Sequence, residues 1–232
     1  MSITGNARKL TFVSKNLGKD IDLMLMFEPP KLGELYTDLY PVCWKVLQFS
    51  ASNISTAVAL YTADTAFMKE DDSNIVSALN VQKCQVREPN YDKFAYPQSH
   101  SIHSGWRDML VDDQHQGKQL PYCARSRYPG LIQCKIQSTK PADVAFGIVG
   151  KDQSVSPIFK WNGLAVDSNL AVKLSPVLKI YGVSDYQSSE ILRGDVTTEE
   201  LFNQDLTKLP HESTWNVVRD PSSLQLKIVR AK

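Results

Sequence analysis

Three of the four histidines in this chain lie close together in the sequence, as His100, His103 and His115. Imidazole nitrogens are frequent ligands of zinc and copper, and three of them can hold one such ion and leave a coordination position open for chemistry. Asp108 or Asp113 would then serve as a general acid or base. The stretch has no HExxH motif and no helical periodicity, so we interpret the histidines as exposed or hydrogen-bonded side chains. A small metal-dependent enzyme is the alternative.

Aromatic and arginine side chains are concentrated in the same part of the chain. Rings supply rigid contact area and guanidinium groups supply planar hydrogen-bond donors, which is the composition of contact surfaces. We expect Tyr96, Trp106, Arg107 and Tyr128 to contact a ligand. The charges of the segment nearly cancel, which favours a carbohydrate or another small polar ligand over a polyanion. The alternative is that these rings pack over an open end of the fold.

Motifs of the common enzyme classes are absent from the sequence. It contains no GxSxG nucleophile elbow, no GxGxxG fingerprint and no P-loop. We therefore expect a non-enzymatic, lectin-like binding protein. A lipid-binding or pore-forming β protein is a further interpretation, weakened by the neutral charge and by the lack of a long amphipathic hairpin.

The overall charge narrows the range of partners. The chain of 232 residues has 26 basic and 25 acidic residues, for a formal net charge of +1. No strong field attracts nucleic acid or an anionic membrane, so we expect neither as a partner. The sequence shows no signal peptide and no apolar run of membrane-spanning length, which favours a cytoplasmic or otherwise soluble protein. The four cysteines show no CxxC spacing, and we expect most of them to be reduced and buried. A bridge between Cys123 and Cys134 is the alternative if the protein is exported.

Short apolar segments with the two-residue period of β-strands dominate the rest of the sequence. Residues 131–138 and 224–230 alternate apolar and polar side chains, which predicts strands with one buried face. Other segments are apolar on both faces and rich in β-branched or aromatic residues, namely 21–27, 41–49, 56–62, 143–149 and 177–183. Met24 and Met26 occupy the second face of 21–27, which indicates either a central strand or the interface of a homodimer.

Turn and helix signals separate these strands. Asn162-Gly163 lies between two apolar runs and predicts a hairpin turn. Residues 197–209 predict a helix, because Thr197 and Glu200 match a capping box and Phe202, Leu206 and Leu209 recur with helical spacing. A shorter helix is predicted over 31–40.

These elements together predict an all-β fold. We expect a single domain, a two-layer antiparallel β-sandwich with one or two short helices. Its strand-rich halves, 1–88 and 130–232, are joined by a long irregular connector over 89–129. Connectors of that length without periodicity are frequently functional, so the connector is where we expect the ligand to bind.

Overall fold

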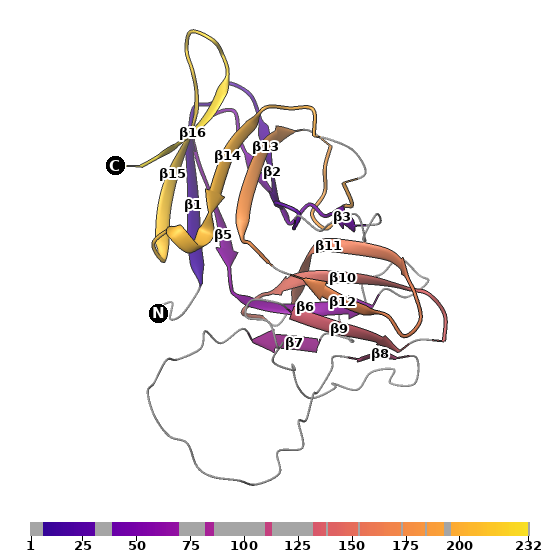
Figure 1. Ribbon diagram of the computed structural model, residues 1–232. Helices are drawn as coiled ribbons and strands as arrows, with labels where there is room; N and C mark the ends of the chain where they lie inside the picture. The colour runs from indigo at the N-terminus through magenta and orange to yellow at the C-terminus, as the bar shows by residue number, and fades with distance from the viewer. Residues whose placement is uncertain are drawn as a thin grey trace, which may run out of the picture.

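The computed structural model describes residues 7–30, 39–69, 82–85, 110–112, 132–137, 139–152, 154–172, 174–183, 185–192 and 196–231. The regular secondary structure of the described residues is almost entirely β-strand, which confirms the predicted all-β class (Figure 1). No helix in this part of the chain has the length and apolar character needed to cross a membrane.

Sheet A joins the two ends of the described chain in the order β16-β15-β1-β5. Its strands are β1 (Arg8–Lys15), β5 (Ile54–Tyr61), β15 (Glu212–Arg219) and β16 (Leu226–Arg230). β1 runs parallel to β15 and antiparallel to β5, and β15 and β16 form an antiparallel pair. The first strand therefore occupies the middle of a sheet that only the last strands complete (Figure 1).

Sheet B has the order β14-β13-β2-β4 and is antiparallel throughout. Its strands are β2 (Ile21–Phe27), β4 (Lys45–Phe49), β13 (Val177–Val183) and β14 (Glu200–Asp205). The prediction of a central strand over 21–27 is confirmed, since β2 pairs on both sides. Met24 and Met26 are buried beside Cys43 and Leu192, so this face of β2 is covered by the chain itself.

The middle of the chain forms two further sheets. Sheet C has the order β3-β11-β10-β6-β7, and sheet E has the order β12-β9-β8. The strands of sheet C are β3 (Leu39–Pro41), β6 (Asp64–Lys69), β7 (Gln82–Gln85), β10 (Ala142–Val149) and β11 (Val155–Leu164). Those of sheet E are β8 (Leu110–Asp112), β9 (Ile132–Gln137) and β12 (Asn169–Val172). β8 belongs to the segment expected to be an irregular connector and pairs parallel with β9.

Sheets A and B pack against each other through aromatic rings. Phe202 of β14 contacts Phe12 of β1 and Trp215 of β15, at centroid distances of 6.0 and 4.8 Å. Phe27 of β2 contacts Tyr61 of β5 at 5.9 Å. Each side chain belongs to one continuous hydrophobic core. Burial of a side chain of this size contributes about 1.5–3 kcal/mol.

The predicted helix over 197–209 is wrong. Residues 200–205 form β14, which pairs with β13, and only Leu206–Lys208 form a turn of 3-10 helix. The three apolar residues at helical spacing, Phe202, Leu206 and Leu209, are buried as predicted. A strand followed by a 3-10 turn buries them as well as a helix would, and the backbone of β13 supplies hydrogen bonds along one side of β14. The shorter predicted helix lies mostly outside the described residues.

The predicted hairpin at Asn162-Gly163 is also wrong, because both residues lie within β11. The pairing with β10 shifts here between Ala142↔Leu164 and Val144↔Trp161, so the extra residue on β11 makes a β-bulge. Gly163 has a φ of +61°, and its N–H donates to Oδ1 of Asp143 at 2.8 Å. Gly163 does adopt the left-handed conformation that a hairpin turn would require, but it does so in a β-bulge.

Candidate ligand-binding cleft

A cleft of about 450 Å³ opens between sheets A and B. Its walls come from the start of β2, the end of β13, the start of β14 and the β15–β16 hairpin, which lie in the upper part of Figure 1. The lining residues are Lys19, Asp20, Ile21, Asp22, Gly182, Val183, Thr198, Glu199, Leu201, Arg219, Gln225 and Leu226. The cleft therefore combines an apolar surface with seven polar or charged side chains.

Gly182 lets the side chains of Leu201 and Leu226 pack closely over the strand in the apolar part of the cleft. A Cβ atom at this position would lie 3.3 Å from Cδ1 of Leu201 and 3.3 Å from Cδ2 of Leu226. Both distances are tight for carbon atoms, so any side chain here would have to displace the two leucines. An isolated glycine inside a strand often marks a close approach of this kind.

Arg219 is held in place at the cleft by backbone carbonyls. Its Nε donates to the carbonyl oxygen of Leu17 at 3.1 Å, and its Nη1 donates to that of Leu224 at 2.8 Å. A guanidinium group carries five N–H donors in a fixed planar arrangement. Within the described residues no carboxylate pairs with Arg219, so three of its donors are left for a ligand.

The turn that supplies Leu17 is itself fixed by hydrogen bonds to the β4–β5 turn. Asn16 and Gly18 donate their backbone N–H groups to the carbonyls of Asn53 and Ala51, at 2.9 and 2.8 Å. Oδ1 of Asp20 accepts from the N–H of Ala51 at 2.7 Å. Asn16 and Gly18 have positive φ values, as the sequence of this turn predicts. The wall carrying Lys19 and Asp20 is therefore preorganised.

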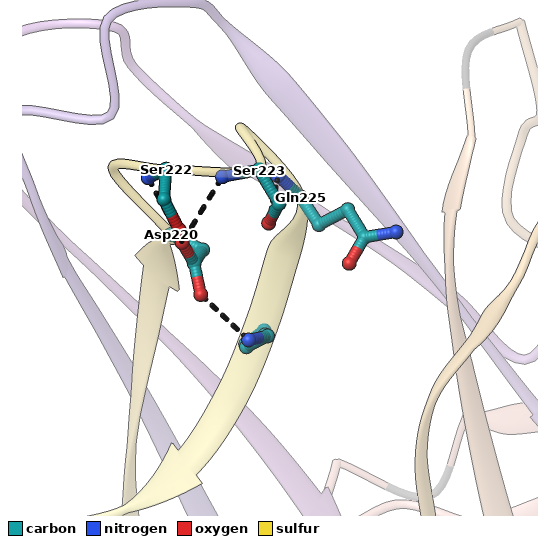
Figure 2. Close-up of polar contacts among 5 residues, drawn as sticks. Asp220, Ser222, Ser223 and Gln225 are labelled. Carbon is teal, nitrogen blue, oxygen red and sulfur yellow. Dashed lines mark hydrogen bonds and ion pairs between the residues drawn. The ribbon is translucent and has the colours of Figure 1, made fainter.

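The opposite wall rests on a tightly bonded hairpin turn after β15. Oδ1 of Asp220 accepts from the N–H and Oγ of Ser222, at 3.0 and 2.6 Å, and from the N–H of Ser223 at 3.2 Å (Figure 2). Its Oδ2 pairs with Nζ of Lys227 at 2.7 Å. The hydrogen bonds from Lys227 and the two serines hold the pKa of Asp220 well below its usual value. This turn places Gln225 and Leu226 at the cleft.

The polar lining is balanced between hydrogen-bond donors and acceptors. Asp20, Asp22 and Glu199 supply carboxylates, whereas Lys19 and Arg219 supply cationic donors. Thr198 and Gln225 add groups that both donate and accept. The residues of the cleft include no histidine, cysteine or aromatic ring. The arrangement offers several hydrogen-bond donors and acceptors to a small polar molecule.

A second polar cluster lies on sheet B and is satisfied internally. Nζ of Lys179 lies 3.5 Å from Glu28 and 3.3 Å from Glu200, and Glu200 also accepts from Asn203 and Tyr181. Burial opposes the charge of Lys179, but the hydrogen bond and charge of Glu200 and the charge of Glu28 outweigh it and raise the pKa of Lys179. These groups bond to one another, unlike the unused donors of Arg219.

The residues predicted from the sequence to bind a ligand or metal fall outside the described part of the chain. They are Tyr96, Trp106, Arg107 and Tyr128 for a ligand, and His100, His103, His115, Asp108 and Asp113 for a metal-dependent enzyme. These assignments stay predictions. Among the described residues no group of three or more His, Cys, Asp or Glu side chains is placed to hold a metal ion.

Comparisons with known proteins identify no relative. No family model, no curated protein and no solved structure matches the chain. The cleft is therefore the feature of the described residues on which a functional assignment depends.

Proposed function

We propose that this protein is a non-enzymatic binding protein for a carbohydrate or another small polar ligand, which it holds in the cleft between sheets A and B. The observation that carries this proposal is the guanidinium group of Arg219. Two backbone carbonyls fix it at the cleft and leave three donors without a partner among the described residues. A fixed donor array costs little conformational entropy when a ligand binds.

The other lining groups support a ligand rich in hydroxyl groups. Carboxylates such as those of Asp22 and Glu199 accept hydrogen bonds from hydroxyls, while Arg219, Lys19 and Gln225 donate to their lone pairs. Leu201 and Leu226 form an apolar surface against which the C–H groups of a sugar ring can pack. Three carboxylates against two cations disfavour an anionic ligand.

A glycan array probed with the labelled protein, followed by calorimetric titration of each hit, tests the proposal. Arg219→Lys removes the planar fork but keeps the charge, and we expect it to weaken binding of a hit by about tenfold, equivalent to about 1.4 kcal/mol. Gly182→Val should abolish binding, because its side chain displaces Leu201 and Leu226 from the apolar part of the cleft. Arg8→Lys is the matched control, because Arg8 is also held by backbone carbonyls, at 2.9 Å from Leu206, and does not line the cleft.

The outcome also distinguishes the cleft from the aromatic segment predicted by the sequence. Trp106→Ala should leave the affinity unchanged if the cleft is the site. Loss of binding in Trp106→Ala, with normal binding in Arg219→Lys and Gly182→Val, would overturn the proposal for the cleft. An array without hits, together with unchanged melting temperatures in the presence of millimolar free sugars, would contradict the carbohydrate assignment.

A further inference from the structure

Within the part of the chain that the structure describes, β5 is a long sheet edge without protection against pairing. It spans Ile54–Tyr61, eight residues, and lies at the end of sheet A, where β1 is its one neighbour among the described strands. The strand ISTAVALY contains no charged residue and no proline. Its outward side chains include Ile54, Val58 and Leu60, which are 66%, 44% and 42% exposed. An edge of this kind presents unpaired backbone groups to another strand.

The other sheet edges in the described part of the chain are short or carry the residues that discourage pairing. Lys, Arg, Asp, Glu and Pro at an edge oppose the approach of a further strand. These residues are Lys227 and Arg230 in β16, Glu200 and Asp205 in β14, Lys45 in β4 and Pro41 in β3, whereas β7 and β8 have four and three residues. β12 has four residues. Among the described edges β5 alone is both long and uncharged.

We propose that β5 pairs antiparallel with β5 of a second copy of this chain, so that two copies of sheet A form one continuous sheet. In a pairing centred on Ala57, Ile54 lies opposite Leu60 of the second copy, and Thr56 lies opposite Val58. All four side chains point outward on the same face, because they are two residues apart along the strand. The pairing covers the most exposed apolar side chain of sheet A, Ile54.

A second copy fits this edge better than an unrelated strand because the edge is complementary to itself. In the two-fold arrangement, apolar side chains of β5 in one copy lie opposite apolar side chains of β5 in the other, and like charges do not come together. The nearest outward cations are Lys9 and Lys15 of β1, which pair with Leu60 and Ile54. Across the dimer they would be separated by three strand spacings, roughly 14 Å, which exceeds the screening length of physiological salt.

The association also closes after two copies. A dimer of this type uses the same edge on both molecules, and the other edge of sheet A, β16, carries Lys227 and Arg230. The paired chains therefore expose no second uncharged edge of sheet A for continued growth. The proposal is independent of the cleft, because none of the residues of β5 lines it.

Sedimentation velocity and light scattering over a wide range of concentration test the dimer. The wild-type protein should reach a mass near twice its 26.0 kDa at high concentration. Val58→Lys should remain monomeric at the same concentrations. Val229→Lys is the matched control: Val229 is also 44% exposed, and it lies on the same face as Val58, because Thr56, Val13, Asn216 and Val229 are opposite one another in successive strands. This variant should dimerise like the wild type.

Hydrogen exchange gives a second readout that needs no variant. Amides of Ile54–Tyr61 should exchange more slowly as the wild-type concentration rises, whereas those of β16 should not change. A wild-type protein of monomer mass at every concentration would overturn the proposal. So would equal dissociation of the Val58→Lys and Val229→Lys dimers, or concentration-dependent protection of a strand other than β5. If Val58→Lys does not fold, the wild-type exchange pattern decides.

Discussion

At the scale of single residues, burial controls the acid–base behaviour of several ionisable groups. Burial raises the pKa of the Cys43 thiol to about 12, and the negative charge of Glu190 adds to the effect. Burial also raises the pKa of Tyr61 to about 12, although the nearby Arg8 opposes it. Both groups are therefore neutral at physiological pH. The sequence predicted buried cysteines, and it predicted Tyr61 within a strand that is apolar on both faces, 56–62.

The raised pKa of Tyr61 predicts a loss of stability at alkaline pH. Between pH 10 and 12 the unfolded chain loses the phenol proton while the folded chain keeps it, so rising pH favours unfolding. Tyr61→Phe removes this group, and its free energy of unfolding should fall less between pH 9 and pH 11, by about 1 kcal/mol. Urea unfolding at the two pH values measures the difference. Identical alkaline losses in the two proteins would contradict the assigned burial of the phenol.

At the scale of elements, short apolar runs rich in β-branched or aromatic residues were a reliable signal. The segments 21–27, 143–149 and 177–183, predicted as strands apolar on both faces, match β2, β10 and β13 to within one residue. Segment 197–209 was misassigned because its polar residues fit a helix start. In the structure Glu200 has cross-strand partners instead, Tyr181 and Lys179. The secondary-structure preferences of residues 197–209 could not show that β13 would lie beside them and pair with them as a strand.

The bulge at Gly163 predicts a substitution effect that depends only on the backbone. Gly163 has a φ of +61°, and a Cβ atom there would meet no other atom within 4 Å. Gly163→Ala should therefore destabilise the protein by about 1 kcal/mol through backbone strain alone. Gly163→Asn should cost less, because asparagine tolerates the left-handed region. Chemical denaturation measures both, and equal stability of the two variants and the wild type would show that the bulge is absent.

At the scale of the whole molecule, the arrangement of strands lay beyond the sequence. The cleft brings together residues near positions 20, 182, 199, 219 and 226, which no local pattern connects. Gly182 carried a signal that would have indicated a close approach, since it interrupts an apolar strand. Arg219 carried none, because its role depends on the carbonyls of Leu17 and Leu224. Pairing between strands that are far apart in the sequence brings such residues together. The periodicity of a segment shows only which face of that one strand is buried.

The packing of sheet A on sheet B predicts an energetic coupling between residues far apart in the sequence. Phe12 and Phe202 meet edge to face, with their ring centroids 6.0 Å apart and their planes at 73°. A double-mutant cycle with Phe12→Leu and Phe202→Leu should give a coupling energy of about 0.5–1.5 kcal/mol, the range found for aromatic pairs. Urea unfolding followed by tryptophan fluorescence provides the four free energies.

The control cycle combines Phe12→Leu with Val229→Ala, because Val229 lies on the opposite, outward face of sheet A and is 44% exposed. These two changes should add to within about 0.5 kcal/mol. A coupling of zero between Phe12 and Phe202 would contradict the contact between these two rings. The cleft depends on contacts of this kind, because its walls come from both sheets.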